Sequence, residues 1–149
     1  MRAVVQRVRN ASVTVNGTVT GSISHGLLVY LGVEQGDQED DISYAARKIA
    51  QLRIFEDDQG KLNLSVKDIG GGILMISQFT LCADTRKGNR PSFNKAESPE
   101  RAREYVEKCS QLISSCYTVP VESGVFGAHM DVTYTNDGPV TIIIDTKEQ

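Results

Sequence analysis

The first part of the chain alternates polar and apolar residues, a pattern that predicts β-strands. Residues 2–9 alternate, and residues 12–23 do so around an Asn-Gly pair, which is typical of a hairpin loop. If residues 15–17 form a three-residue loop, Val13 is expected to pair with Val19. This part of the chain therefore predicts antiparallel strands.

Apolar runs and helical spacing predict the elements that follow. Residues 27–33 form a short apolar run, as expected for a central strand that is buried on both faces. A helix capped by Asp40 or Asp41 is expected next. Its apolar positions follow helical spacing: Ile42, Ala45, Ala46, Ile49 and Leu52. Residues 54–66 predict a second hairpin, and three glycines precede another apolar strand at 73–79.

The second half of the chain predicts one long helix and three further strands. Ser98 as a cap, Pro99 and an acidic first turn indicate where the helix begins. Its apolar stripe predicts packing on a sheet and comprises Ala102, Tyr105, Val106, Cys109, Leu112, Ile113 and Cys116. Strands are expected at 119–125, 130–135 and 140–145. Because strands outnumber helices and hairpins dominate, we expect an α+β fold, with a largely antiparallel, barrel-like sheet and two main helices packed on it.

The composition fits one domain that spans residues 1–149. Hydrophobic residues make up 40% and charged residues 23%, which is the balance of a globular protein and not of a disordered or fibrous one. No apolar run reaches the roughly 18 residues that a membrane span requires. Because the first residues alternate, they do not form a signal peptide, and we expect a cytoplasmic protein that does not bind membranes.

Few residues suit a disulfide or a metal site. The cysteines, Cys82, Cys109 and Cys116, cannot all pair with one another, and we expect them to be reduced. Cys109 and Cys116 share a helix face and are interpreted as small core residues. Each histidine, His25 or His129, stands beside a small residue and not beside a second ligand. Neither a metal nor a cofactor is therefore expected.

The polar segment at the end of the predicted strand 73–79 is the first candidate for chemistry. Ser77, Gln78, Phe79 and Thr80 follow wholly apolar residues and precede a basic loop. Main-chain N–H groups leave the β-ladder at a strand end and can bind an oxyanion, and Thr80 can position water. The alternative is a strand end whose hydroxyls cap a turn. No histidine-centred triad is evident, so a threonine nucleophile has little support.

The segment at residues 136–141, Asn-Asp-Gly-Pro-Val-Thr, is the second candidate. A plain turn between two strands explains its composition. The Gly138-Pro139 pair, however, presents two main-chain carbonyls with almost no side chain between them. Such a surface can accept hydrogen bonds from an ammonium group without reading a side chain.

The loop at residues 86–95 is the third candidate, because it is basic in a chain whose net charge is −3. It contains one aromatic ring, Phe93, no acid and four cations: Arg86, Lys87, Arg90 and Lys95. Two interpretations are open. The loop is either a solvated surface loop, or a contact for the phosphate backbone of a nucleic acid, with Phe93 stacked on a base.

Three segments together resemble the D-aminoacyl-tRNA deacylase family, whose members include D-tyrosyl-tRNA deacylases. They are the opening residues Met-Arg-Ala-Val-Val-Gln-Arg-Val, the Ser-Gln-Phe-Thr-Leu sequence at 77–81, and the segment at 136–141. The segments occur in the family's order, and the resemblance covers nearly the whole chain. It implies an enzyme that hydrolyses the ester between a D-amino acid and the 3′ end of tRNA. It also implies a barrel-like homodimer that needs no metal or cofactor.

The resemblance also implies roles for individual residues. Gly138 and Pro139 are joined by a cis bond in the family, and the pair enters the partner's site as a chiral selector, with Arg7 fixing its orientation. The pocket for the aminoacyl-adenosine end is lined by Ser77, Gln78, Phe79 and Thr80. Phe126 and Met130 resemble family residues near that pocket. The ribose 2′-hydroxyl of the substrate is implied as a participant, which agrees with the lack of a base–nucleophile pair.

Three other functions compete with this interpretation. A sister enzyme of the same fold removes a mischarged L-amino acid, and the implied role of Arg7 argues against it. A non-catalytic RNA-binding module would use the loop at 86–95 and leave the ester intact. A small-molecule hydrolase would use Thr80 and cleave simple esters that lack RNA.

Overall fold

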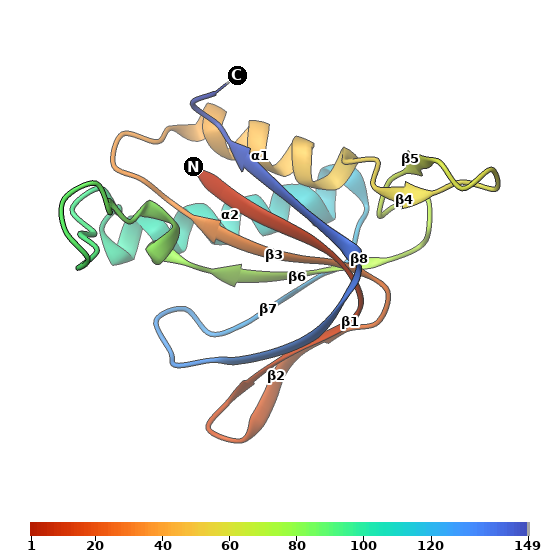
Figure 1. Ribbon diagram of the computed structural model, residues 1–149, viewed down its shortest axis with the longest axis horizontal. Coiled ribbons are helices and arrows are strands. Elements are labelled where there is room, and N and C mark those ends of the chain that lie inside the picture. Colours follow the sequence, from red (N-terminus) through yellow and green to blue (C-terminus); the bar gives the residue numbers. More distant parts are fainter. Residues whose placement is uncertain (149) are drawn as a thin grey trace.

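The computed structural model describes residues 1–148 and places two helices over one face of a strongly curled sheet (Figure 1). In chain order the elements are β1 (Arg2–Val15), β2 (Thr18–Ile23), β3 (Gly26–Gly32), α1 (Glu39–Gln51), β4 (Phe55–Glu56), β5 (Leu62–Leu64), β6 (Gly72–Ser77), the 3₁₀-helix η1 (Phe79–Cys82), α2 (Pro99–Tyr117), β7 (Val121–Ser123) and β8 (Asp131–Asp145). The expected α+β class with two main helices is confirmed. Within residues 1–148, no helix is long and apolar enough to cross a membrane.

The main sheet is mixed, and β1 organises its antiparallel part. The first half of β1 pairs with β3 and its last residues pair with β2, while β8 runs antiparallel along most of its length. The β3–β6 and β6–β7 pairs are parallel, so the sheet is less purely antiparallel than expected. The short strands β4 and β5 form a separate hairpin, as the pattern at 54–66 predicts.

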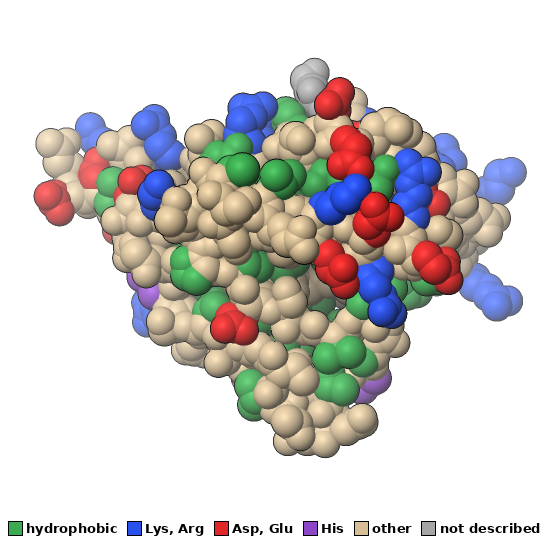
Figure 2. Space-filling model, turned by 180° about the vertical axis from the view of Figure 1, so that it is seen from behind, with side chains coloured by type: hydrophobic (Ala, Val, Ile, Leu, Met, Phe, Trp, Pro, Cys, Tyr) green, Lys and Arg blue, Asp and Glu red, His purple; other side chains and the backbone are tan. Residues whose placement is uncertain are grey.

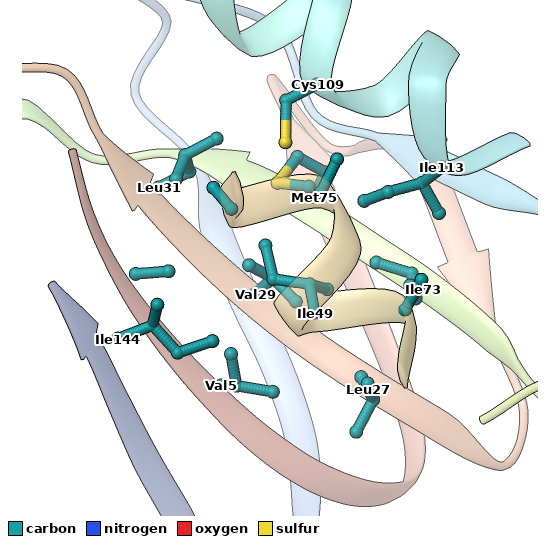
Figure 3. Packing of buried hydrophobic residues seen from close by; sticks show 14 of the residues in the cluster. Val5, Leu27, Val29, Leu31, Ile49, Ile73, Met75, Cys109, Ile113 and Ile144 are labelled. Carbon is teal, nitrogen blue, oxygen red and sulfur yellow. The ribbon is translucent and has the colours of Figure 1, made fainter. Parts of the chain in front are cut away.

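The central strand β3 is buried on both faces, as its apolar run predicts. Val29 belongs to the cluster under the helices, whereas Leu28 belongs to a second cluster on the opposite face. Figure 3 shows Ile49 of α1 and Cys109 and Ile113 of α2 around the first cluster. Because both faces of β3 are covered, this strand and its neighbour β6 form a fixed base for the residues that follow β6.

The helices begin and end slightly differently from the sequence prediction. Gln38, and not Asp40 or Asp41, is the cap residue of α1, and the Asp41 carboxylate accepts a hydrogen bond from the Gln38 N–H at 2.8 Å. Ser98 and Pro99 begin α2 as predicted. Cys109 is buried, but Cys116 is exposed, because the fully buried residues of α2 end at Ile113. Cys116 is therefore not a core residue.

Strand pairing corrects the first predicted hairpin. Val15 pairs with Thr18, so only Asn16 and Gly17 form the loop, and both have positive φ (49° and 78°). Two left-handed residues suit the twist of a two-residue hairpin. An irregularity after Val13 makes this residue pair with Gly21 and not with Val19.

Two strand predictions near the candidate site also need correction. The strand predicted at 73–79 ends at Ser77, where its parallel pairing with Leu31 stops, and the chain continues into η1. The three strands predicted after α2 are two, because the strands predicted at 130–135 and 140–145 are parts of the single strand β8 (Asp131–Asp145). The segment at 136–141 is thus not a turn that reverses the chain.

Candidate functional site

A cavity of about 460 Å³ opens at the carboxyl end of β6 and is lined by residues from four parts of the chain. The predicted site residues that line it are Ser77, Gln78, Phe79, Phe126 and Met130. They come from the strand end, from η1 and from the segment between β7 and β8. The parallel pairing of β6 with β7 brings the two sequence regions together. The cavity is large enough for a ligand of the size of a nucleoside with an attached amino acid.

The chain after β6 is held in place by short-range hydrogen bonds. The Gln78 N–H donates to the Leu31 carbonyl oxygen at 2.9 Å, which fixes the exit from the sheet. The Gln78 side chain donates through Nε2 to the hydroxyl of Thr80. Thr80 is exposed and is not among the residues that line the cavity. Thr80 is connected to the cavity by its hydrogen bond with Gln78, which lines it.

The aromatic ring of Phe126 is in contact with a cation. The Arg103 guanidinium of α2 lies 5.1 Å from the centre of the Phe126 ring, in cation–π geometry. A smaller cavity of about 270 Å³ adjoins this contact, and Phe126, Met130 and Ser77 line both cavities. Sequence reasoning did not find Arg103, because an exposed arginine on a helix gives no signal for a contact with a distant loop.

Two titratable side chains that sequence reasoning did not assign also line the cavity, Glu97 and His129. The Glu97 carboxylate accepts a hydrogen bond from the Ser98 N–H at 2.8 Å, and His129 is almost fully exposed. Within residues 1–148, no hydrogen bond joins Ser77 or Thr80 to a histidine or a carboxylate. The described residues thus hold no preformed nucleophile–base pair at this cavity.

The part of the chain that the structure describes contains no group of three or more His, Cys, Asp or Glu side chains fitted to a metal ion. All three cysteines are free. Burial raises the pKa of the Cys109 thiol to about 12 and that of Cys82 to about 11. These two thiols therefore stay protonated at neutral pH.

Gly138 and Pro139 lie in a local bulge of β8 and are joined by a cis bond. Pairing between β8 and β1 runs to Asn136 opposite Val8 and resumes at Thr141 opposite Gln6, so residues 137–140 loop out without a change of direction. The Val140 N–H donates to the side-chain oxygen of Asn136 at 2.9 Å and closes the bulge. Gly138 and Pro139 are exposed, and neither lines the cavity of its own chain.

Arg7 supports the bulge from the interior. Its side chain is 9% exposed, and its Nε donates to the Asp137 main-chain oxygen at 3.0 Å. Its Nη1 donates to the Ile54 main-chain oxygen at 2.8 Å. The Asp137 carboxylate contacts both arginines, because its Oδ1 lies 3.1 Å from Nη2 of Arg9 and its Oδ2 lies 3.6 Å from Nε of Arg7. Arg7 thus makes a direct contact with the residue before Gly138.

The loop at residues 86–95, called the basic loop below, is stabilised by hydrogen bonds and an ion pair at its start. Asp84 and Ser92 exchange two main-chain hydrogen bonds of 2.7 and 3.0 Å. The Asp84 carboxylate is paired with the Arg86 guanidinium, whose hydrogen bonds hold the pKa of that carboxyl far below its usual value. Within residues 1–148, no ion pair involves Lys87, Arg90 or Lys95. Three of the four predicted cations are thus unpaired, and Arg86 is neutralised by its neighbour.

The charges of the opposite side of the molecule are arranged differently. Figure 2 shows acidic and basic side chains interspersed on the upper part of this face, and few charges on the lower part. The basic side chains that project at its right-hand edge lie on the side where Figure 1 shows the loop between η1 and α2.

Comparisons with known proteins agree with this arrangement. Residues 4–145 match the family model described as D-Tyr-tRNA(Tyr) deacylase. The chain is 57% identical over 149 residues to the D-aminoacyl-tRNA deacylase of Natranaerobius thermophilus (strain ATCC BAA-1301 / DSM 18059 / JW/NM-WN-LF), covering 100% of this chain and 99% of that protein. A solved structure described as c-Myc DNA Unwinding Element Binding Protein is 41% identical, with a TM-score of 0.92 over 97% of this chain and 98% of the other.

A more distant structure shares the fold alone. It is described as a probable eukaryotic D-amino acid tRNA deacylase, and it is 16% identical. Its TM-score is 0.81 over 96% of this chain and 97% of the other. The same arrangement of strands and helices thus persists where few residues are shared.

Proposed function

Because the chain belongs to the family of D-aminoacyl-tRNA deacylases, we propose that it is a cytoplasmic chiral proofreading enzyme. It is a hydrolase that acts on D-aminoacyl-tRNA. In the proposal it releases free D-amino acid and tRNA, and the main chain of Gly138-Pro139 excludes L-aminoacyl-tRNA. No metal or cofactor takes part.

The cavity at the end of β6 receives the aminoacyl-adenosine end of the tRNA. Its volume of about 460 Å³ suits a nucleoside that carries an amino acid. Ser77, Gln78 and Phe79 line it, and Thr80 reaches it through its hydrogen bond with Gln78. The main chain leaves the β-ladder at Ser77, and the Gln78 N–H is bonded to the Leu31 carbonyl oxygen. The next N–H groups, those of Phe79 and Thr80, can face the ester oxygen.

The substrate supplies the reactive group that the protein lacks. Neither Ser77 nor Thr80 is hydrogen-bonded to a base in residues 1–148, which argues against a nucleophile activated by a side chain. The ribose 2′-hydroxyl stands next to the ester and assists the attack of water on the carbonyl carbon. The ester bond breaks, and the 3′-hydroxyl of the tRNA is the leaving group. The protein then contributes orientation of the ester and main-chain dipoles toward the developing oxyanion.

A second copy of the chain completes the site. Gly138 and Pro139 are exposed and lie outside their own chain's cavity, so a selector role requires the cavity of a partner. The strand that carries them, β8, pairs with β1 and has no other partner strand in residues 1–148. We therefore propose a homodimer in which the Gly-Pro pair of each chain enters the cavity of the other.

Chirality follows from which groups of the substrate are fixed. If the Gly138 and Pro139 carbonyls hold the ammonium group and the cavity at Ser77 holds the ester, only two groups at the α-carbon remain. The enantiomers then differ in whether hydrogen or the side chain points at the Gly-Pro main chain. A wall of main chain leaves room for hydrogen but not for a methyl group, so every L-residue with a Cβ is excluded.

The basic loop contacts the tRNA beyond its 3′ end. Lys87, Arg90 and Lys95 form no ion pair in residues 1–148, so their charge is available for phosphates. Arg86 was predicted to share this role, but its pairing with Asp84 supports a smaller contribution. Such contacts strengthen binding without reading the base sequence.

The observation that carries the proposal is the exposed Gly138-Pro139 main chain, held from behind by buried Arg7 and lying outside its own cavity. The decisive test is incubation with D- and L-tyrosyl-tRNA, D- and L-alanyl-tRNA, and glycyl-tRNA. We expect both D-esters and the glycyl ester to be hydrolysed, and L-alanine to be rejected as firmly as L-tyrosine. Comparable rates on D- and L-tyrosyl-tRNA would overturn the selector.

The same assay separates the competing functions. Loss of mischarged L-esters alone would identify the sister type of deacylase. Binding of tRNA with an intact ester would identify an RNA-binding module. Cleavage of simple esters without RNA, abolished in Thr80→Ala, would identify a small-molecule hydrolase.

A further inference from the structure

We infer that Phe79 and Phe93 form an aromatic platform that receives the base immediately 5′ of the terminal adenosine. Phe79 makes the stacking contact, and Phe93 is a positioning residue that fixes the Phe79 ring. This inference rests on the proposed function, because it requires the aminoacyl-adenosine end to occupy the cavity at Ser77. It adds a nucleotide subsite outside that cavity.

The two rings come from separate segments and meet at the rim of the cavity. Phe79 lines the cavity, yet the residue is 55% exposed. The Phe93 ring packs edge-on against it, with ring centres 5.1 Å apart and planes at 71°. This is a favourable aromatic geometry, which restricts how the Phe79 ring turns. Phe79 is thus an oriented apolar surface that remains open to a ligand.

Phe93 is itself fixed on both sides in the sequence. Before it, Asp84 and Ser92 close the basic hairpin with their two main-chain hydrogen bonds. After it, the Lys95 carbonyl oxygen accepts a hydrogen bond from the Gln35 N–H at 2.9 Å, and the Glu97 N–H donates to the Val33 carbonyl oxygen at 3.0 Å. The loop is therefore tied to the end of β3, which holds Phe93 against Phe79.

The chemistry of the rim suits a single-stranded nucleotide. Aromatic side chains stack unpaired bases of any type, with an effect on affinity of roughly 5- to 150-fold for each base. Arg90 and Lys95 flank Phe93 in the sequence and have no acidic partner in residues 1–148, so they are available for the linking phosphate. An RNA strand that leaves the cavity over Phe79 would thus contact the aromatic ring first and the cations of the basic loop next.

The other phenylalanine that lines the cavity, Phe126, is less suitable for the same base. The Arg103 guanidinium already lies 5.1 Å from its ring centre. A base that stacked on this side of Phe126 would have to displace the cation. The exposed ring of Phe79 has no such cover, so the geometry favours exit of the RNA strand on the side of the basic loop.

The test compares two minimal substrates, D-tyrosyl-adenosine and the 3′-D-tyrosyl ester of cytidylyl-adenosine. The dinucleotide carries the base that the platform is expected to hold, and the nucleoside does not. For the unmodified enzyme we expect kcat/KM to be roughly 5- to 150-fold higher on the dinucleotide, mostly through a lower KM. In Phe93→Ala the ratio of the two kcat/KM values should fall several-fold, because the loss on the dinucleotide exceeds any loss on the nucleoside.

Two further variants show whether the effect belongs to the ring. Phe93→Tyr retains an aromatic ring and should restore the preference for the dinucleotide. Leu62→Ala removes an exposed apolar side chain of β5, far from the rim in the sequence, and should leave the preference unchanged. Thermal unfolding of each variant checks that the fold is intact.

Each outcome bears on a different claim. No preference for the dinucleotide in the unmodified enzyme, or equal losses on both substrates in Phe93→Ala, would refute the platform while leaving the deacylase intact. No hydrolysis of either substrate or of D-tyrosyl-tRNA would instead refute the proposed function. A preference that falls in Phe93→Ala and returns in Phe93→Tyr would support the platform.

Discussion

Arg7 binds the main-chain oxygen of Asp137, a residue 130 positions away, through a hydrogen bond of 3.0 Å. A second hydrogen bond of 2.8 Å ties the same guanidinium to the Ile54 carbonyl oxygen. A planar, permanently charged fork can satisfy two separate main-chain acceptors at once, and a lysine ammonium does so less well. Arg7 thus sets the position of the residue that precedes Gly138.

We expect Arg7→Lys to lower both stability and selective deacylation. Loss of one buried hydrogen-bond donor leaves a main-chain acceptor unsatisfied and costs about 1–3 kcal/mol. Urea unfolding measures the stability, and rates on D-tyrosyl-tRNA measure the function. Arg9→Gln is the matched control, because Arg9 also contacts Asp137 but is 70% exposed, and its loss should cost at most about 1 kcal/mol. Equal effects of the two substitutions would contradict the positioning role.

Gly138→Ala should disturb the selector more than an ordinary glycine substitution. Gly138 has a φ of +141°, and a Cβ placed there would lie 2.9 Å from the Val140 nitrogen and 2.8 Å from its Cγ2. Gly17→Ala is the control, since Gly17 has a φ of +78° but open space around an added Cβ. We expect Gly17→Ala to cost about 1 kcal/mol of stability with unchanged deacylation, and Gly138→Ala to lose most activity on D-tyrosyl-tRNA.

If the selector acts in the partner's cavity, inactive variants should complement one another. A Gly138→Ala chain retains its cavity, and a Gln78→Ala chain retains its Gly-Pro pair. Mixing and reassociation of the two would produce heterodimers with one complete site. Recovered deacylation above the sum of the separate variants is the expected result, and sedimentation velocity verifies the dimer. A monomeric enzyme with full activity would refute the shared site.

The path of β8 shows what the sequence predicted and what it did not. An Asn-Asp-Gly-Pro segment indicates a turn when only neighbouring residues are considered. The long antiparallel pairing of β1 with β8 overrides this local signal, because the same partner strand continues on both sides of residues 137–140. Local composition therefore located the segment, but only long-range pairing determined that it projects as a bulge.

The site shows the same division between local and distant information. Ser77, Gln78 and Phe79 were found as a polar strand end, and the strand before them was predicted from its apolar run. Their proximity to Phe126 depends on the β6–β7 pairing, and the Arg103 contact depends on how α2 packs. No local pattern encodes these distances. The contacts around the cavity therefore could not be predicted without the fold.

Thr80→Ala should retain substantial activity, whereas replacement of the terminal 2′-hydroxyl by hydrogen should abolish it. Thr80 is exposed, and its hydroxyl is hydrogen-bonded to Gln78 with no base beside it in residues 1–148. The 2′-hydroxyl is part of every natural substrate and is placed next to the ester. Single-turnover rates on D-aminoacyl-tRNA that ends in adenosine or in 2′-deoxyadenosine measure both effects. An inactive Thr80→Ala enzyme with full activity on the deoxy substrate would indicate a threonine nucleophile.

Acid should destabilise the protein partly through Asp145. Burial raises the pKa of this carboxyl, but hydrogen bonds from the Lys147 N–H and Arg2 and the charge of Arg2 outweigh it, so the folded-state pKa is lowered. Its stabilisation is present above the unfolded value of about 3.9 and is lost as pH falls through the folded pKa. Asp145→Asn should therefore be less stable at pH 7 but lose less stability between about pH 4 and 2. Urea unfolding across this range tests it, with the same substitution at exposed Asp58 as a control for the removal of a surface carboxylate.

The salt dependence of tRNA binding should show which cations of the basic loop contact phosphates. Each phosphate contact contributes about one unit to the slope of log affinity against log salt concentration. Arg90→Gln should reduce this slope by about one unit for any tRNA, because Arg90 has no acidic partner in residues 1–148. Arg86→Gln should reduce it less, because Asp84 already neutralises that guanidinium. Asp84→Asn should steepen the slope by freeing Arg86 for a phosphate. Identical slopes in all three variants and in the unmodified enzyme would show that the loop does not touch the RNA.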